Sequence, residues 1–183
     1  MRYFALSLIA LALFSGCSTK KKRPKTADAA SAALATALKK GDGQAIYDLL
    51  DQKSKWSLMS ALRAQREIRK LVKKHYPKDR QPRLLARTRG AAKSADATKY
   101  FLFVVKRDRL FATLGSADSA AKARARSTDR ADFAAGGKLR RFCHADGVWT
   151  FCGFRARFEA LKVRANRDLT TVRENAETFR KGG

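Results

Sequence analysis

Apolar residues recur at helical spacing along the chain before residue 77. The pattern predicts one helix over residues 28–40, which begins at Asp28 and ends at Gly41, and a second helix that begins at Asp42. After a polar stretch at 51–55, a third helix extends to Pro77. The apolar stripes of the three helices are Ala30, Leu34, Ala37 and Leu38; Ala45, Ile46, Leu49 and Leu50; and Leu58, Ala61, Leu62, Ile68, Leu71 and Val72.

The third predicted helix has a basic face opposite its apolar face. Two interpretations stay open: this face binds an anionic partner, or it is a solvated helix surface, which Glu67 would suit because it interrupts the positive charge. The basic residues, at steps of three and four, are Arg63, Arg66, Lys70, Lys73 and Lys74.

The pattern changes beyond residue 80. Residues 80–97 are polar and broken by Pro82 and Gly90, so they predict a loop around one short element. Residues 99–105 (KYFLFVV) are aromatic and β-branched and predict a buried strand, which a turn at 106–109 connects to a second strand at 110–114. Residues 116–138, rich in Ala, Arg, Ser and Asp, predict a long exposed loop or a loosely helical segment.

A hairpin is predicted around Asp146-Gly147, the sequence of a two-residue turn. In that register Cys143 and Cys152 are diagonal neighbours on one face, and a small register change or a bulge would bring the two sulfurs together. We therefore expect a disulfide; a pair of reduced thiols packed beside the strands is the alternative. Two cysteines and the nearby His144 do not supply the four ligands of a zinc site, so we expect neither metal nor cofactor.

The same register gives the hairpin an aromatic face of Phe142, Trp149 and Phe151. Residues 154–181 predict a long helix; its first half packs on the core, and its alanine-rich second half either projects or pairs with another helix, so a protein partner could bind there. The predicted fold is α+β: N-terminal helices, then an antiparallel sheet of about four strands, closed by the long C-terminal helix. The apolar stripe of that helix is Phe158, Leu161, Ala165, Leu169, Val172, Ala176 and Phe179.

The chain begins with Arg2, an apolar run over residues 3–14, and Ser15-Gly16-Cys17. The run is shorter than the roughly 20 residues of a membrane-spanning helix, and the segment resembles the signal peptide and lipobox of bacterial lipoproteins, apart from Phe14, where an aliphatic residue is usual. The resemblance implies removal of residues 1–16, lipidation of Cys17 and, because Ser18 follows, attachment to the outer membrane facing the periplasm. An ordinary secretory peptide is the alternative.

Residues 17–26 then form a basic tether, and residues 27–183 a single α+β domain. Near an anionic membrane each basic residue contributes about 1 kcal/mol to attraction, so the tether either holds the domain against the surface or is only a disordered spacer. The basic residues of the tether are Lys20, Lys21, Lys22, Arg23 and Lys25.

The net charge of the chain is +25, and about +24 without residues 1–16. Such charge favours anionic partners, which in the cell envelope are anionic lipid, lipopolysaccharide or cell-wall polymer. For an exported protein, nucleic acid is the least expected of the anionic partners. The charge could also serve solubility alone.

The stretch ALKKGDGQAIYDLL, with Leu38, Gly41 and Asp42, resembles the opening helix pair of NTF2-like domains, and Gly147-Val148-Trp149 resembles their closing strands. This resemblance implies a half-open sheet wrapped as a cone around a long helix, with a pocket lined by Phe103, Trp149 and Phe151. It carries over no catalytic residue.

Candidate catalytic groups are few. His75 lies near a helix end and His144 near Asp146, and neither is part of a nucleophile, phosphate-loop or metal motif. We therefore expect a non-catalytic, lipid-anchored envelope protein that acts as a binding or scaffold module. An NTF2-like protein that binds or turns over a small apolar molecule is the alternative.

Overall fold

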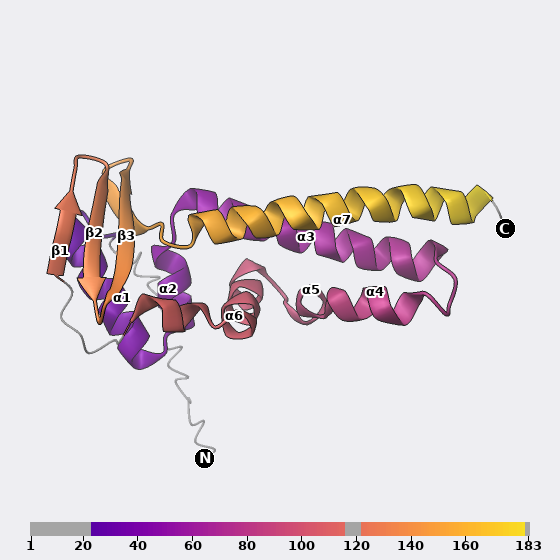
Figure 1. Cartoon of the computed structure of the whole chain (residues 1–183), viewed down its shortest axis with the longest axis horizontal. Coiled ribbons are helices and arrows are strands. Elements are labelled where there is room, and N and C mark those ends of the chain that lie inside the picture. The colour runs from indigo at the N-terminus through magenta and orange to yellow at the C-terminus, as the bar shows by residue number, and fades with distance from the viewer. Residues whose placement is uncertain (1–22, 116–121, 182–183) are drawn as a thin grey trace, which may run out of the picture.

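The computed structural model describes residues 23–115 and 122–181, so Cys17, Lys20, Lys21 and Lys22 lie outside it. The fold is α+β, as the sequence predicts. A four-stranded antiparallel sheet lies at one end of the molecule, and two long helices extend from it side by side (Figure 1).

Capping side chains set the start of the first two helices. Helix α1 (Ala27–Lys40) begins one residue earlier than predicted, because the Thr26 hydroxyl, and not Asp28, accepts a hydrogen bond from the Ala29 amide (3.2 Å). Gly41 ends α1 with a left-handed backbone (φ 64°). Asp42 then caps α2 (Gly43–Leu49), as predicted, by accepting a hydrogen bond from the Ala45 amide (2.9 Å).

The two long helices run in the same direction. Helix α3 (Gln52–His75) begins inside the stretch expected to be polar coil, because Asp51 caps it. Helix α7 (Arg155–Lys181) confirms the predicted C-terminal helix, and its second half pairs with α3, which was one of the two alternatives. The apolar cluster of this distal part is Ile68, Val72, Tyr76, Val172 and Ala176.

Residues 80–115 are helical, and three predictions for them were wrong. The expected loop at 80–97 forms α4 (Gln81–Arg87) and α5 (Arg89–Lys93), the expected strand at 99–105 lies within α6 (Ala97–Arg107), and the expected strand at 110–114 is the 3-10 helix η1 (Leu110–Leu114). Asp96 caps α6 by accepting a hydrogen bond from the Lys99 amide (2.8 Å). The buried residues of α6 lie at helical spacing: Tyr100, Phe101, Val104 and Val105.

The sheet contains β1 (Lys122–Arg126), β2 (Arg130–Ala135), β3 (Lys138–Ala145) and β4 (Val148–Phe151) in that order, all antiparallel. The first two strands correct the prediction of an exposed loop at 116–138. In β2, Ala131, Phe133 and Ala135 are buried on the core side. Because alanine has a low preference for strands, this alternation does not predict a strand from the sequence.

The predicted hairpin is present. Ala145 pairs with Val148, and Asp146 and Gly147 both have positive φ (52° and 73°), as a type I′ turn requires. A disulfide joins Cys143 to Cys152, with 5.9 Å between the two Cα atoms. The Cys152 amide donates to the Arg141 carbonyl (3.0 Å), so the diagonal placement itself brings the sulfurs together.

The main core lies between the sheet, α1, α2, α3, α6 and the start of α7. Helix α1 covers β3 and β4, whereas α3 and α7 extend beyond the sheet (Figure 1). Six phenylalanines of this core contact one another in edge-to-face pairs: Phe101, Phe133, Phe142, Phe151, Phe154 and Phe158.

Candidate anion-binding groove

A basic groove runs along α3 beside α5, on the face of α3 that does not pack on α7. Its volume is about 430 Å³, and α5 and the residue after it contribute its small and polar lining. Among the described residues, those lining the groove include four basic side chains and no carboxylate. We call this feature the basic groove; it is lined by Arg66, Arg69, Lys70, Lys73, Ala91, Ala92 and Ser94.

Two arginines of the groove are held by backbone carbonyls. Arg66 donates from Nη2 to the carbonyl oxygens of Ser94 (2.6 Å) and Ala95 (2.8 Å). Arg69 donates from Nη1 to the Leu85 carbonyl (2.9 Å). These carbonyls lie near the ends of α5 and α4, where a positive charge is favourable. The guanidinium groups are therefore fixed in position, with further N–H donors left.

Lys70 and Lys73 project into the groove from successive turns of α3. Both residues are exposed, and neither side chain has a hydrogen bond or ion pair within the part of the chain that the structure describes. Two exposed ammonium groups beside two fixed guanidinium groups are the kinds of donor that bind phosphate and carboxylate in proteins.

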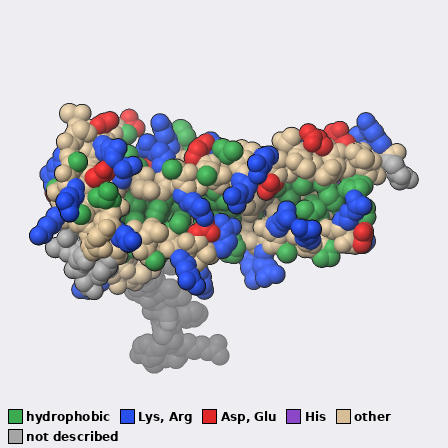
Figure 2. Space-filling model, in the orientation of Figure 1, with side chains coloured by type: hydrophobic (Ala, Val, Ile, Leu, Met, Phe, Trp, Pro, Cys, Tyr) green, Lys and Arg blue, Asp and Glu red, His purple; other side chains and the backbone are tan. Residues whose placement is uncertain are grey.

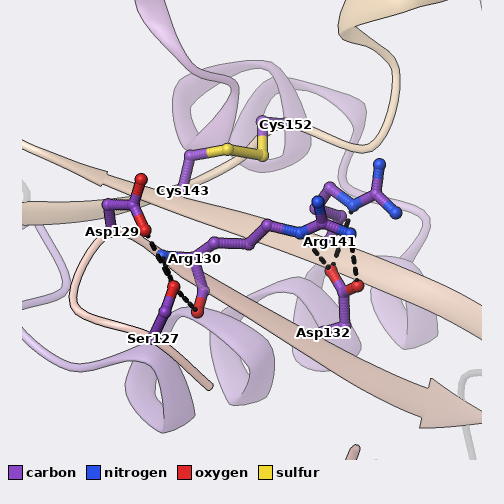
Figure 3. A network of polar contacts seen from close by, with 7 residues as sticks. All are labelled: Ser127, Asp129, Arg130, Asp132, Arg141, Cys143 and Cys152. Carbon is purple, nitrogen blue, oxygen red and sulfur yellow. Dashed lines mark hydrogen bonds and ion pairs between the residues drawn. A yellow bond between two sulfur atoms is a disulfide. The ribbon is translucent and has the colours of Figure 1, made fainter. Parts of the chain in front are cut away.

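Carboxylates elsewhere in the protein pair with arginines. Asp132 accepts from Arg130 (2.7 Å) and Arg141 (3.1 Å), and Figure 3 shows both contacts. The hydrogen bond from Arg130, then that from Arg141, lowers the pKa of Asp132. Asp108 is held in the same way by Arg107 and Arg157, and its pKa is also lowered, first by the hydrogen bond from Arg107. These carboxylates do not line the basic groove.

The structure divides the predicted basic stripe. Arg66, Lys70 and Lys73 meet in the groove, whereas Arg63 and Lys74 are exposed on α3 outside its lining. Arg69 is a groove residue that the sequence prediction missed, although it lies three residues after Arg66 and four before Lys73. Figure 2 shows Lys and Arg side chains over both ends of the visible face, so charge density alone does not identify the groove.

The three predicted pocket residues lie in different places. Phe151 is fully buried in the core. Phe103 packs under α5, where a Cβ on Gly90 would lie 2.1 Å from its ring. Trp149 is half-buried and stacks on His144, with 5.1 Å between the ring centroids. The resemblance to NTF2-like domains stays a prediction, but these three side chains do not enclose one cavity.

Residues 23–26 of the predicted tether are described. Pro24, between Arg23 and Lys25, accepts a hydrogen bond at its carbonyl from the Trp149 amide (2.9 Å), so this end of the tether lies against β4. Arg23 and Lys25 are exposed. No described helix combines the length and the apolar character needed to cross a bilayer.

The comparisons with known proteins give no identification. No protein-family model, no curated protein and no solved structure matches this chain.

Proposed function

We propose that this protein is a non-catalytic binding module of the bacterial cell envelope, anchored by lipid at Cys17, whose basic groove binds phosphate or carboxylate groups of an anionic envelope component. The observation that carries the proposal is the placement of Lys70 and Lys73, which share a groove with Arg66 and Arg69 and face no carboxylate. Anionic lipid, lipopolysaccharide and cell-wall polymer all present such groups.

The groove suits an anion for a physical reason. Arg66 and Arg69 are fixed by carbonyl oxygens before any ligand arrives, so little side-chain entropy is lost when an anion binds. The lysines are mobile and can follow anionic groups of different shapes. Hydrogen bonds to charged groups contribute about 1.5–3 kcal/mol each when water is excluded, and less in an open groove.

The anchor would keep the domain close to its ligand. Pro24, which is fixed on β4, follows Cys17 by seven residues, and an extended chain of that length spans about 25 Å. The basic residues Lys20, Lys21 and Lys22 of this segment would add attraction to an anionic surface. The proposed location is the periplasmic face of the outer membrane, in keeping with Ser18 after Cys17.

The experiment measures binding of the chain from residue 17 onward, with Cys17→Ser to remove the lipid, to anionic vesicles, lipopolysaccharide and anionic cell-wall polymer over a range of salt concentrations. We expect tight binding to one of them, which falls as salt rises because counterions screen the groove. The double variant Lys70→Glu/Lys73→Glu should lose most of this binding.

A matched control separates the groove from overall charge. Lys40→Glu/Lys138→Glu changes the net charge by the same amount at two exposed positions outside the groove. If both double variants weaken binding equally, the groove is not the site and only net charge acts. If the unmodified chain binds none of the three ligands, the proposed function is wrong.

A further inference from the structure

Both tryptophans of the protein line one cavity, which is separate from the basic groove. The cavity lies between the junction of α2 and α3 and the β3–β4 turn, and its volume is about 440 Å³. Trp56 comes from the first turns of α3 and Trp149 from β4, 93 positions later in the chain. We call this feature the tryptophan cavity.

Trp56 is unusual in its exposure. The residue is 58% exposed, and no other large apolar residue of the described chain is more exposed. It does not contribute to either apolar core. A tryptophan left in water at the rim of a cavity offers a large, rigid apolar face to a ligand at small cost in conformational entropy.

Trp149 is held more firmly. Its amide donates to the Pro24 carbonyl (2.9 Å), and its ring stacks on that of His144 with an interplanar angle of 29°. The His144 amide in turn donates to the Asp129 carbonyl (2.8 Å). Trp149 is thus fixed before a ligand arrives, which lowers the free-energy cost of binding.

The polar lining of the cavity is balanced in charge. It includes four basic and four acidic side chains among the described residues, whereas the basic groove has no acidic one. Asp146 lies in the β3–β4 turn, and within the described residues its carboxylate makes no hydrogen bond or ion pair. Asp129 accepts a hydrogen bond from Ser127 (2.8 Å), as Figure 3 shows.

We propose that the tryptophan cavity binds a short oligosaccharide. A pyranose ring has an apolar face of C–H groups, which stacks on an indole, and a rim of hydroxyls, which donate to carboxylates and accept from lysine and amide groups. Two indoles, an Asp146 carboxylate without a partner among the described residues, and a lining of balanced charge fit such a neutral ligand. The carboxylates disfavour a phosphate-rich ligand, and the concave shape disfavours a flat lipid surface.

The test uses tryptophan fluorescence, because both fluorophores line the proposed site. The chain from residue 17 onward with Cys17→Ser is titrated with chitotetraose and, separately, with cellotetraose. We expect a saturable change in emission with at least one of them that is insensitive to salt. Trp56→Ala should weaken binding about tenfold or more, as expected for a central aromatic contact, and Trp56→Phe should retain most of the binding.

The variants separate a loss of saccharide binding from a loss of folding and from binding at the basic groove. Because Trp56 is exposed, Trp56→Ala should leave the circular dichroism spectrum unchanged, and Trp149 remains as the reporter. Asp146→Asn tests the free carboxylate and keeps a side chain that tolerates positive φ. Lys70→Glu/Lys73→Glu should leave saccharide binding intact, which distinguishes this site from the basic groove.

Two outcomes would overturn the proposal. The first is no saturable change with either saccharide; a blue shift of the emission on neutral phosphatidylcholine vesicles would then make this face a membrane contact. The second is saccharide binding that Trp56→Ala and Asp146→Asn both leave unchanged, which would place the site elsewhere.

Discussion

The Arg155 guanidinium at the start of α7 contacts the Asp51 carboxylate at the start of α3, with 3.0 Å between Nη2 and Oδ2. The same carboxylate caps α3 by accepting from the Ser54 amide (3.4 Å), and the Asp51 amide donates to the Phe151 carbonyl of β4 (3.1 Å). Asp51 is only 4% exposed. One buried residue thus connects the sheet to both long helices.

Asp51→Ala should lower the free energy of unfolding by about 2 kcal/mol, since it removes a helix cap and leaves the Ser54 amide and Arg155 without their partner. Asp51→Asn should cost less than half of that, because an asparagine side chain still caps a helix. Urea unfolding followed by circular dichroism measures both. Asp42→Ala, at the exposed cap of α2, is the control and should cost about 1 kcal/mol; a smaller loss at Asp51 than at Asp42 would contradict the role assigned to Asp51.

Two buried tyrosines give opposite predictions for loss of a hydroxyl. Tyr76, directly after α3, donates to the Val172 carbonyl of α7 (3.3 Å), so Tyr76→Phe should lower the free energy of unfolding by about 1 kcal/mol. The Tyr100 hydroxyl is buried without a hydrogen-bond partner among the described residues, so Tyr100→Phe should leave stability unchanged or raise it. Thermal or urea unfolding of the two variants in parallel tests this, and a substantial loss from Tyr100→Phe would show that its hydroxyl is bonded.

Tyr100 also predicts a loss of stability in alkali. Burial raises its pKa to about 12, above the ordinary value near 10. The folded state then keeps a proton that the unfolded state releases, so stability is fully present below pH 10 and falls as the pH rises toward 12. The two pKa values correspond to a loss of stability of roughly 3 kcal/mol at most. Between pH 8 and about pH 11 the free energy of unfolding should fall less for Tyr100→Phe than for the unmodified protein. An equal fall in both proteins would assign the alkaline loss of stability to other groups.

How far the sequence could predict the fold depended on the range over which each signal acts. Local signals succeeded: Asp42 caps α2, and Asp146-Gly147 forms the turn that brings Cys143 to Cys152. The strand prediction for residues 99–105 was wrong. Their β-branched and aromatic side chains favour a strand, but the cap at Asp96 and the burial of Tyr100, Phe101 and Val104 on one side select a helix.

The sites depended on contacts between distant residues. The basic spacing along α3 predicted Arg66, Lys70 and Lys73, but the groove itself needs α5, which lies in a segment expected to be a loop. No sequence pattern relates Trp56 to Trp149, because long-range contacts, such as the bridge between Leu50 and Phe151 and the hydrogen bond from the Asp51 amide to the Phe151 carbonyl, bring the start of α3 beside β4.

Acid should weaken the protein through Asp132 and Asp108, each of which lies between two arginines. Their lowered pKa values mean that both carboxylates stay charged in the folded state at pH values where the unfolded state begins to bind protons. Their contribution is therefore present above about pH 4 and lost as the pH falls through the lower folded pKa. The arginines are partly exposed, so solvent limits each contribution to about 1 kcal/mol or less.

The variants Asp132→Asn and Asp108→Asn test this pH dependence. Each should be less stable than the unmodified protein at pH 7 and equally stable at about pH 2. Unfolding free energies from urea titrations at the two pH values measure the difference. A deficit that persists unchanged in acid would mean that asparagine disturbs packing rather than removing an ion pair.

The Cys143–Cys152 disulfide should contribute about 2–3 kcal/mol to the free energy of unfolding, from the entropy of closing a short loop in the unfolded chain. The sulfurs lie on the face of the hairpin opposite Phe142 and Phe151, so Cys143→Ser/Cys152→Ser should spare the core. Because Cys143 also lines the tryptophan cavity, loosening β4 should weaken saccharide binding and leave anion binding at the basic groove unchanged. Urea unfolding of the oxidised protein, the dithiothreitol-reduced protein and the double variant measures the contribution of the disulfide to the free energy of unfolding. Equal urea midpoints for all three would show that the turn at Asp146-Gly147 alone holds the two strands in register.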